Sequence, residues 1–200
     1  DYQPSRGLGD VYKRQVSCEG EGARIWWPNK DHITAEGDSV KMTYTVPSNL
    51  VAVGNGKLRS VKNIGEKTSY EWFVSNPINN YNISVQIGNY VAVQDTFIKD
   101  NQTHFMNHYV LDYNKELASN FFPQSKEVIR FYEKYFGDYQ WYEDGYKLIE
   151  VPYLGMEHQS AVTYGNGFSM YNGVRSKSWP MYGVIDPLII HETGHEWFGN

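Results

Sequence analysis

The sequence has a single cysteine, Cys18, in 200 residues. An internal disulfide is therefore impossible, and no cluster of thiolates can hold a metal ion. The chain also lacks a run of about 18 apolar residues, the length that a helix needs to span a bilayer. Basic residues are fewer than acidic ones, 18 against 23, for a formal net charge of −5. Because no basic run offsets this balance, we expect no nucleic-acid partner and no binding to an anionic membrane surface.

The two ends of the sequence carry little structural signal of their own. Residue 1 is Asp1 and not Met, and residues 7–15 show neither the period of a strand nor that of a helix. We expect residues 1–15 to be a non-native or disordered tail. The final residues, Trp197–Asn200, continue a motif, so we expect the sequence to belong to a longer protein. The cellular compartment stays open between cytoplasm and export.

Residues 16–110 have the pattern of β-structure. Strands are predicted over 71–74, 81–87 and 90–98, and the clearest alternation of apolar with polar residues is Val40, Met42, Tyr44 and Val46. Asn55-Gly56 follows the apolar residues 50–53 and predicts a tight hairpin turn. Short strands at this spacing indicate an N-terminal domain of antiparallel sheets, a sandwich or a saddle.

Residues 111–200 have a mixed pattern. A helix is expected to begin at Phe122-Pro123, with one apolar face at a spacing of three and four residues: Val128, Ile129, Phe131, Tyr132, Tyr135 and Phe136. Strands are predicted over 147–151 and 160–164, and a last helix begins at Asp186 with Pro187 behind it. The predicted fold class is therefore α+β, with a domain boundary at 108–114.

The strongest chemical signal is His191-Glu192-Thr193-Gly194-His195 on that last helix. Residues four apart share a helix face, with Cβ atoms about 5–6 Å apart, so both imidazoles can reach one zinc ion. Glu192 lies about 100° round the helix from His191 and is free to act as a base on a metal-activated water. The alternative is a chance match on a buried helix. Gly194 is costly inside a helix, which indicates a close neighbour there, such as a strand or a substrate.

His104 and His108 have the same spacing but are predicted to lie on a strand. Four residues of strand span about 13 Å, too far for the two rings to share an ion. We expect structural or surface roles for this pair, and no chemistry at His32 in its loop.

A second motif, Leu154-Gly155-Met156-Glu157-His158, precedes the metal motif. Together the two motifs resemble those of the zinc aminopeptidases of the aminopeptidase N and leukotriene hydrolase type, which are gluzincin metallopeptidases. Residues 25–32, 46–50 and 54–58 extend the resemblance, which covers about 16–200. It implies a β domain followed by the first part of a thermolysin-like catalytic domain.

The resemblance also implies roles for individual residues. His191 and His195 would bind one Zn²⁺, and Glu192 would be the general base that activates water and later protonates the leaving amine. Glu157 would bind the α-ammonium group of a peptide substrate with a free N-terminus. The backbone of Gly155 and Met156 would lie along the substrate as an extra strand. Tyr164 would line the same wall.

The match departs from the family at two flanking positions, Leu154 in place of a glycine and His158 in place of an asparagine. The family's third zinc ligand, a glutamate, and its intermediate-stabilising tyrosine would lie beyond residue 200. We expect a metallo-aminopeptidase of which this chain alone is inactive. Two alternatives remain open: an epoxide hydrolase or endopeptidase on the same scaffold, and a non-catalytic module in which the β domain binds a partner.

Overall fold

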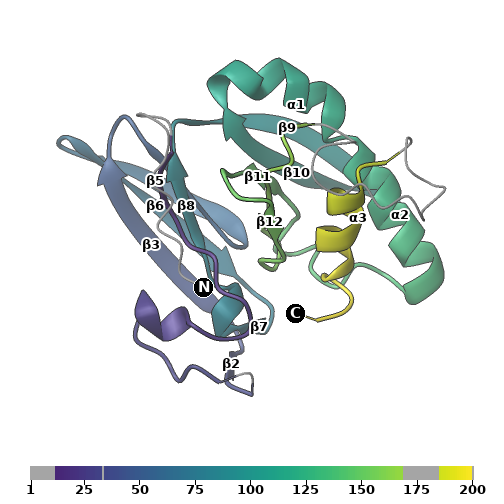
Figure 1. Ribbon diagram of the computed structural model, residues 1–200, viewed down its shortest axis with the longest axis horizontal. Coiled ribbons are helices and arrows are strands. Elements are labelled where there is room, and N and C mark those ends of the chain that lie inside the picture. Colours follow the sequence, from purple (N-terminus) through teal and green to yellow (C-terminus); the bar gives the residue numbers. More distant parts are fainter. Residues whose placement is uncertain (1–11, 33, 169–184, 200) are drawn as a thin grey trace.

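The computed structural model describes residues 12–32, 34–168 and 185–199. The fold is α+β, with several antiparallel sheets and one mixed sheet (Figure 1). Among the described residues, none of the helices has the length and apolar character needed to cross a bilayer.

The first part of the chain forms three antiparallel sheets. One contains β1 (Tyr12–Gln15), β8 (Val85–Gly88) and β4 (Val51–Gly54), in the order β1-β8-β4. A second has the order β3-β6-β5, from β3 (Val40–Pro47), β6 (Lys67–Val74) and β5 (Lys57–Ile64). The third pairs β2 (Glu36–Gly37) with β7 (Ile78–Asn79). Short 3₁₀ turns occupy Ala23–Ile25, Asn80–Asn82 and Asp112–Asn114.

The alternation predicted for β3 is confirmed. Met42 and Val46 are buried, Val40 and Tyr44 are half-buried, and the lysine and threonines between them are exposed. Since successive side chains of a strand point to opposite faces, one face of β3 packs on a core and the other meets solvent.

The five-stranded mixed sheet has the order β12-β13-β11-β10-β9. Its strands are β9 (Tyr90–Lys99), β10 (Gln102–Leu111), β11 (Leu148–Glu150), β12 (Gly155–Met156) and β13 (Val162–Tyr164). β10–β11 and β11–β13 are parallel pairs, and the other two pairs are antiparallel. The predicted boundary at 108–114 lies at the end of β10, yet β9 and β10 belong to the same sheet as β11 to β13. By sheet membership, the chain enters this second unit at Tyr90.

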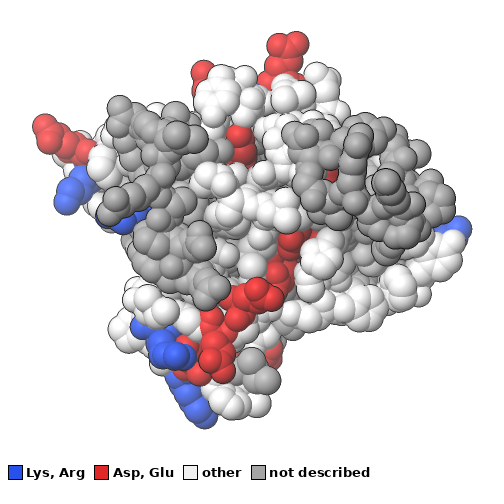
Figure 2. Space-filling model, in the orientation of Figure 1, with Lys and Arg blue, Asp and Glu red and all other residues white. Residues whose placement is uncertain are grey.

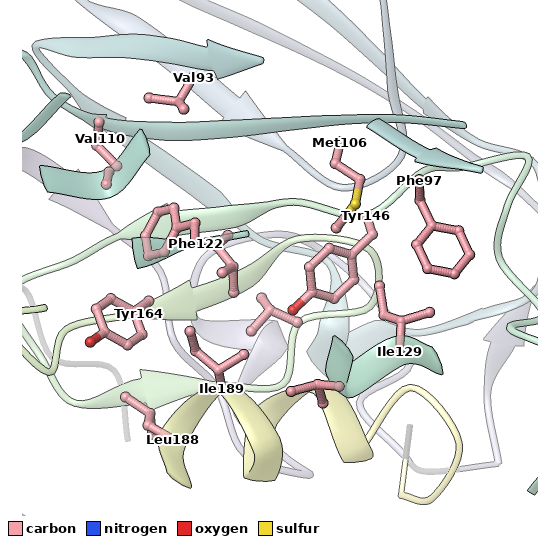
Figure 3. Packing of buried hydrophobic residues seen from close by; sticks show 14 of the residues in the cluster. Val93, Phe97, Met106, Val110, Phe122, Ile129, Tyr146, Tyr164, Leu188 and Ile189 are labelled. Carbon is pink, nitrogen blue, oxygen red and sulfur yellow. The ribbon is translucent and has the colours of Figure 1, made fainter. Parts of the chain in front are cut away.

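Three helices cover the face of the mixed sheet that lies away from β3, β5 and β6 (Figure 1). They are α1 (Lys115–Phe121), α2 (Gln124–Phe136) and α3 (Pro187–Gly194). The core beneath them includes Val110 and Leu148 from the sheet, Phe122 from the α1–α2 turn, and Ile129 and Ile189 from the helices (Figure 3). The neighbouring sheet residues Tyr109, Leu111 and Ile149 point to the opposite face and pack against Trp72 and Val74 of β6. The mixed sheet is therefore buried on both faces. This packing holds the strands in place, and with them the loops that connect the strands.

Four details of the sequence prediction are wrong. Asn55-Gly56 is not a hairpin turn, because β4 pairs with β8 while β5 pairs with β6. The strand predicted over 81–87 is shorter and lies later, because only 85–88 form a strand. Residues 81–86 are all buried and show no alternation of buried with exposed positions. In α2, Val128 and Ile129 are buried, but Phe131, Tyr135 and Phe136 are exposed. Residues 12–15, expected to lie in an irregular tail, form β1 at the edge of a sheet.

Candidate active site

The metal motif lies at the C-terminal end of α3, with His191 and Glu192 inside the helix and His195 as its C-cap. The start of this helix follows from the sequence. Asp186 is the N-cap, and Pro187 occupies the first turn. The Asp186 side chain accepts a hydrogen bond from the Leu188 amide at 2.7 Å, and its other oxygen accepts one from the Tyr164 hydroxyl at 2.7 Å. The cap satisfies a backbone donor that would otherwise be unpaired, so the predicted helix start is confirmed.

The imidazoles of His191 and His195 converge at the exposed side of this helix. Their Nε2 atoms are 3.4 Å apart, and the ring planes are nearly perpendicular. A tetrahedral zinc ion bound by two nitrogens at about 2.0–2.1 Å holds those nitrogens about 3.3–3.4 Å apart. The pair therefore fits one zinc ion. Among the described residues, His191, Glu192 and His195 are the only group of three potential ligand side chains whose atoms lie within 4.8 Å of one another.

Glu192 is buried close to the two histidines, with 6% of its surface exposed. Its Oε2 atom is buried and has no hydrogen-bond partner among the described residues. Burial, followed by the charges of Glu157 and Glu19, raises the pKa of Glu192 to about 8. A carboxyl group with an elevated pKa and a free oxygen is a suitable general base, since proton transfer is most efficient when the pKa is near the working pH.

Gly155 brings the second motif against this carboxylate. A Cβ atom at residue 155 would lie 2.8 Å from the Glu192 Oε1 atom and 3.1 Å from the Thr163 carbonyl. A side chain here would displace the Glu192 carboxylate, and the glycine lets the two come close. β12, which contains Gly155 and Met156, is the outer strand of the mixed sheet, and Met156 is buried. An outer strand is the place where an extended peptide can add to a sheet.

Glu157 follows directly and lies half-buried near the metal helix. Its Oε1 atom accepts a hydrogen bond of 3.3 Å from the Tyr81 hydroxyl, which also contacts the Gly199 carbonyl at 2.7 Å. Tyr81 comes from the first part of the chain, so both parts contribute to the site. Burial raises the pKa of Tyr81 to about 12, and its hydroxyl stays a donor at neutral pH.

Tyr164 does not face this site. Its side chain is 1% exposed and belongs to the core under the helices, where it contacts the Phe122 ring (Figure 3). Its hydroxyl bonds Asp186, and its backbone pairs with Gly155. The predicted wall position for this side chain is corrected: Tyr164 supports the start of α3 from inside.

The other histidines lie apart from the metal group. His104 and His108 are on β10, as predicted; His104 packs on the Tyr142 ring, and His108 is fully buried and accepts a hydrogen bond from the Leu148 amide at 2.9 Å. His32 is exposed in a loop. His158 is fully buried, and burial lowers its pKa to about 3.

The close neighbour expected at Gly194 is a tyrosine of α2. A Cβ atom at residue 194 would lie 2.5 Å from the Tyr132 hydroxyl oxygen. The glycine therefore serves helix–helix packing, and neither a strand nor a substrate occupies the space.

The sequence prediction missed Glu19. Its charge raises the pKa of both Tyr81 and Glu192, which places a third carboxylate in the field of the site. Figure 2 shows acidic side chains gathered in a band through the middle of one face, with no basic side chain in the central part of the band. A negative field of this kind favours a cationic ligand. The only sequence signal for Glu19 was its position just before the 25–32 segment.

The chain resembles known peptidases in sequence and in fold. No family model matches the chain. It is 25% identical over 196 residues to the leucyl aminopeptidase of Saccharolobus solfataricus, covering 96% of this chain and 24% of that protein. The crystal structure of an M1 zinc metallopeptidase from Deinococcus radiodurans superposes with a TM-score of 0.73 at 16% identity. That match covers 100% of this chain and 44% of the metallopeptidase.

The chain matches the N-terminal portion of the M1 zinc metallopeptidases. A mutant of the Deinococcus radiodurans M1 metallopeptidase bound to a Tyr-Ser-Ala substrate also superposes, with a TM-score of 0.69 at 15% identity. That match covers 98% of this chain and 43% of the mutant metallopeptidase. The chain thus spans less than half the length of the M1 metallopeptidases it resembles, and about a quarter of the leucyl aminopeptidase.

Proposed function

We propose that this chain carries the metal-binding and amine-binding part of a zinc aminopeptidase, which removes N-terminal residues from peptides. In this proposal the chain combines an N-terminal β domain with the opening part of a thermolysin-like domain. The observation that carries the proposal is the convergence of the two motifs: Gly155 lies against Glu192, beside two imidazoles whose spacing fits zinc.

His191 and His195 would hold the zinc ion. When bound, zinc polarises the scissile carbonyl and lowers the pKa of a coordinated water to about 7. Glu192 would take the proton from the attacking water at its unpartnered oxygen and then give it to the leaving amine. Burial keeps bulk water away from this carboxyl group.

Glu157 would select the substrate by its charge. A carboxylate 4 Å from an ammonium gains up to about 4 kcal/mol at an effective dielectric constant near 20. Glu19 adds to the same negative field. An acetylated N-terminus or an internal peptide bond offers no ammonium group, so either would leave these carboxylates unpaired.

The test compares hydrolysis of one peptide with a free and with an acetylated N-terminus, in the protein that carries this sequence. We expect the free peptide to be cleaved at least 100 times faster, and Glu157→Gln to reduce that preference while the protein keeps its zinc. Equal rates would instead favour an endopeptidase on this scaffold. Retained zinc with no hydrolysis of peptides or epoxides would favour a non-catalytic module.

A further inference from the structure

Ser160 has an unusual backbone conformation next to the amine-binding motif. Its φ angle is +58°, in the left-handed region that residues with a side chain rarely adopt, and it is fully buried. It lies three residues after Glu157, in the turn that leads into β13. Because such a conformation is strained, the surrounding structure must hold it in place.

Each polar atom of Ser160 has a partner from a different part of the protein. Its amide donates to the Glu196 Oε1 atom at 2.8 Å. Its hydroxyl oxygen accepts a hydrogen bond from the Gly56 amide at 2.8 Å. Its carbonyl accepts one from the Lys147 Nζ atom at 2.7 Å. All four residues are buried, so these bonds are shielded from competing water.

These partners are themselves well fixed. Glu196 follows His195 directly, at the end of the metal-binding segment. Gly56 has a φ angle of +73°, and a Cβ atom there would lie 2.0 Å from the Phe73 carbonyl oxygen, so this position next to β6 requires a glycine. Next to it, the Asn55 side chain donates to the Gln159 carbonyl at 2.7 Å. The turn at Ser160 is thus bound both to the N-terminal β part and to Glu196, the residue after His195.

We propose that Ser160 is a positioning residue, which fixes the Gly155–Glu157 segment relative to His195 and so determines where the Glu157 carboxylate meets a substrate ammonium group. This inference rests on the proposed aminopeptidase function. The hydroxyl oxygen is the decisive atom, because it accepts the hydrogen bond from the Gly56 amide. Removal of that oxygen leaves the buried Gly56 amide without its acceptor and takes away the bond that holds the turn to Gly56.

Two variants test the role of the hydroxyl group. Ser160→Ala removes the oxygen and keeps the backbone strain, whereas Ser160→Gly removes the oxygen and relieves the strain, so at least the second should fold. Ser125→Ala is the matched control. Ser125 is also fully buried, and its hydroxyl donates only to the Phe122 carbonyl at 2.7 Å, in the first turn of α2.

Two measurements apply to each variant. Amide hydrogen exchange over residues 155–160 should become at least ten times faster in both Ser160 variants and stay unchanged in Ser125→Ala. In the protein that carries this sequence, the preference for a free over an acetylated N-terminus should fall at least tenfold. The loss should appear as a higher KM for the free peptide, with kcat changed much less and zinc retained.

The outcomes separate this inference from the proposed function. Unchanged exchange, or an unchanged preference in either folded Ser160 variant, would overturn the positioning role and leave the aminopeptidase proposal standing. A wild-type protein that cleaves free and acetylated peptides equally would overturn the proposed function, and the inference with it, because no ammonium group would then need to be positioned.

Discussion

Glu192 and the two histidines lie close together at the C-terminal end of α3 but have different environments. His191 is exposed, whereas Glu192 is buried with one free oxygen. This difference supports the distinction between ligand and base that the sequence predicted. Glu192 also lies against Gly155 of the second motif, a contact that a ligand role alone would not require.

We therefore expect Glu192→Gln to keep zinc and to lose several orders of magnitude in kcat. The amide has nearly the shape of the carboxylate but cannot take a proton from water. Zinc content by atomic absorption and steady-state kinetics provide the check. Glu127→Gln, the same change at an exposed residue on α2, should alter neither. Loss of zinc from Glu192→Gln would show that Glu192 is a ligand.

His108 makes a second residue-level prediction, about acid stability. It is fully buried, and burial lowers its pKa to about 4, against about 6.5 in an unfolded chain. As the pH falls from 6.5 to 4, the unfolded state takes up a proton that the folded state cannot. Folding stability should therefore fall over this window, by about 2 kcal/mol at pH 5 from this residue.

His108→Asn should make this acid-induced loss smaller by about the same amount. Asparagine keeps an acceptor for the Leu148 amide and does not titrate. Urea unfolding at pH 7.5 and pH 5.0 measures the difference. His32→Asn, in an exposed loop, is the matched control for the substitution itself. If His108→Asn loses as much folding stability between pH 7.5 and pH 5.0 as the wild type, another group causes the loss, and His158 is the first candidate.

At the scale of elements, the start of α3 depends on one side chain. Asp186 is fully buried and accepts hydrogen bonds from the Leu188 amide and the Tyr164 hydroxyl. Asp186→Ala removes the N-cap of α3 and leaves the buried Tyr164 hydroxyl without its carboxylate acceptor. We expect a loss of about 2 to 3 kcal/mol in the free energy of unfolding, measured with urea. Asp112→Ala, at an exposed aspartate, should change it by less than about 0.5 kcal/mol.

Elements with a local cause were predictable from the sequence. The alternation in β3 and the N-cap of α3 need no information from distant residues, and both are confirmed. The two chemical motifs were also local, and the roles proposed for them rest on their spacing on a helix and at a strand edge. The grouping of His191 with His195 was predictable for the same reason.

Elements defined by distant partners were not predictable. Asn55-Gly56 has a hairpin sequence, but its side-chain and backbone bonds go to Asn82, Gln159 and Ser160, 27 to 104 residues away. Polar residues of the 81–87 segment are buried and hydrogen-bond to distant groups; the Gln86 side chain, for example, donates to the Val16 carbonyl at 2.9 Å. An alternating pattern cannot distinguish such buried polar residues from solvent-facing ones.

At the scale of the whole molecule, the described residues supply only part of the ligands that a catalytic zinc ion needs. Catalytic zinc sites usually have three protein ligands and an open position. If Glu192 is the base, then only His191 and His195 remain in the ligand group that the described residues form. The surface near this helix also carries exposed aromatic side chains, including Phe136 and Phe198. Exposed apolar area of this kind favours association with another surface or aggregation.

We therefore expect the 200-residue chain by itself to bind zinc weakly and to show no aminopeptidase turnover. Dialysis against trace zinc, followed by metal analysis, should give well under one ion per chain, and an aminoacyl chromogenic substrate should stay intact. His191→Ala should abolish what binding there is. Tight, stoichiometric zinc with turnover would contradict this prediction and require a third ligand within the chain. Glu196 and His158 would be tested first, by Glu196→Gln and His158→Gln, because each has a buried polar atom without a hydrogen-bond partner among the described residues.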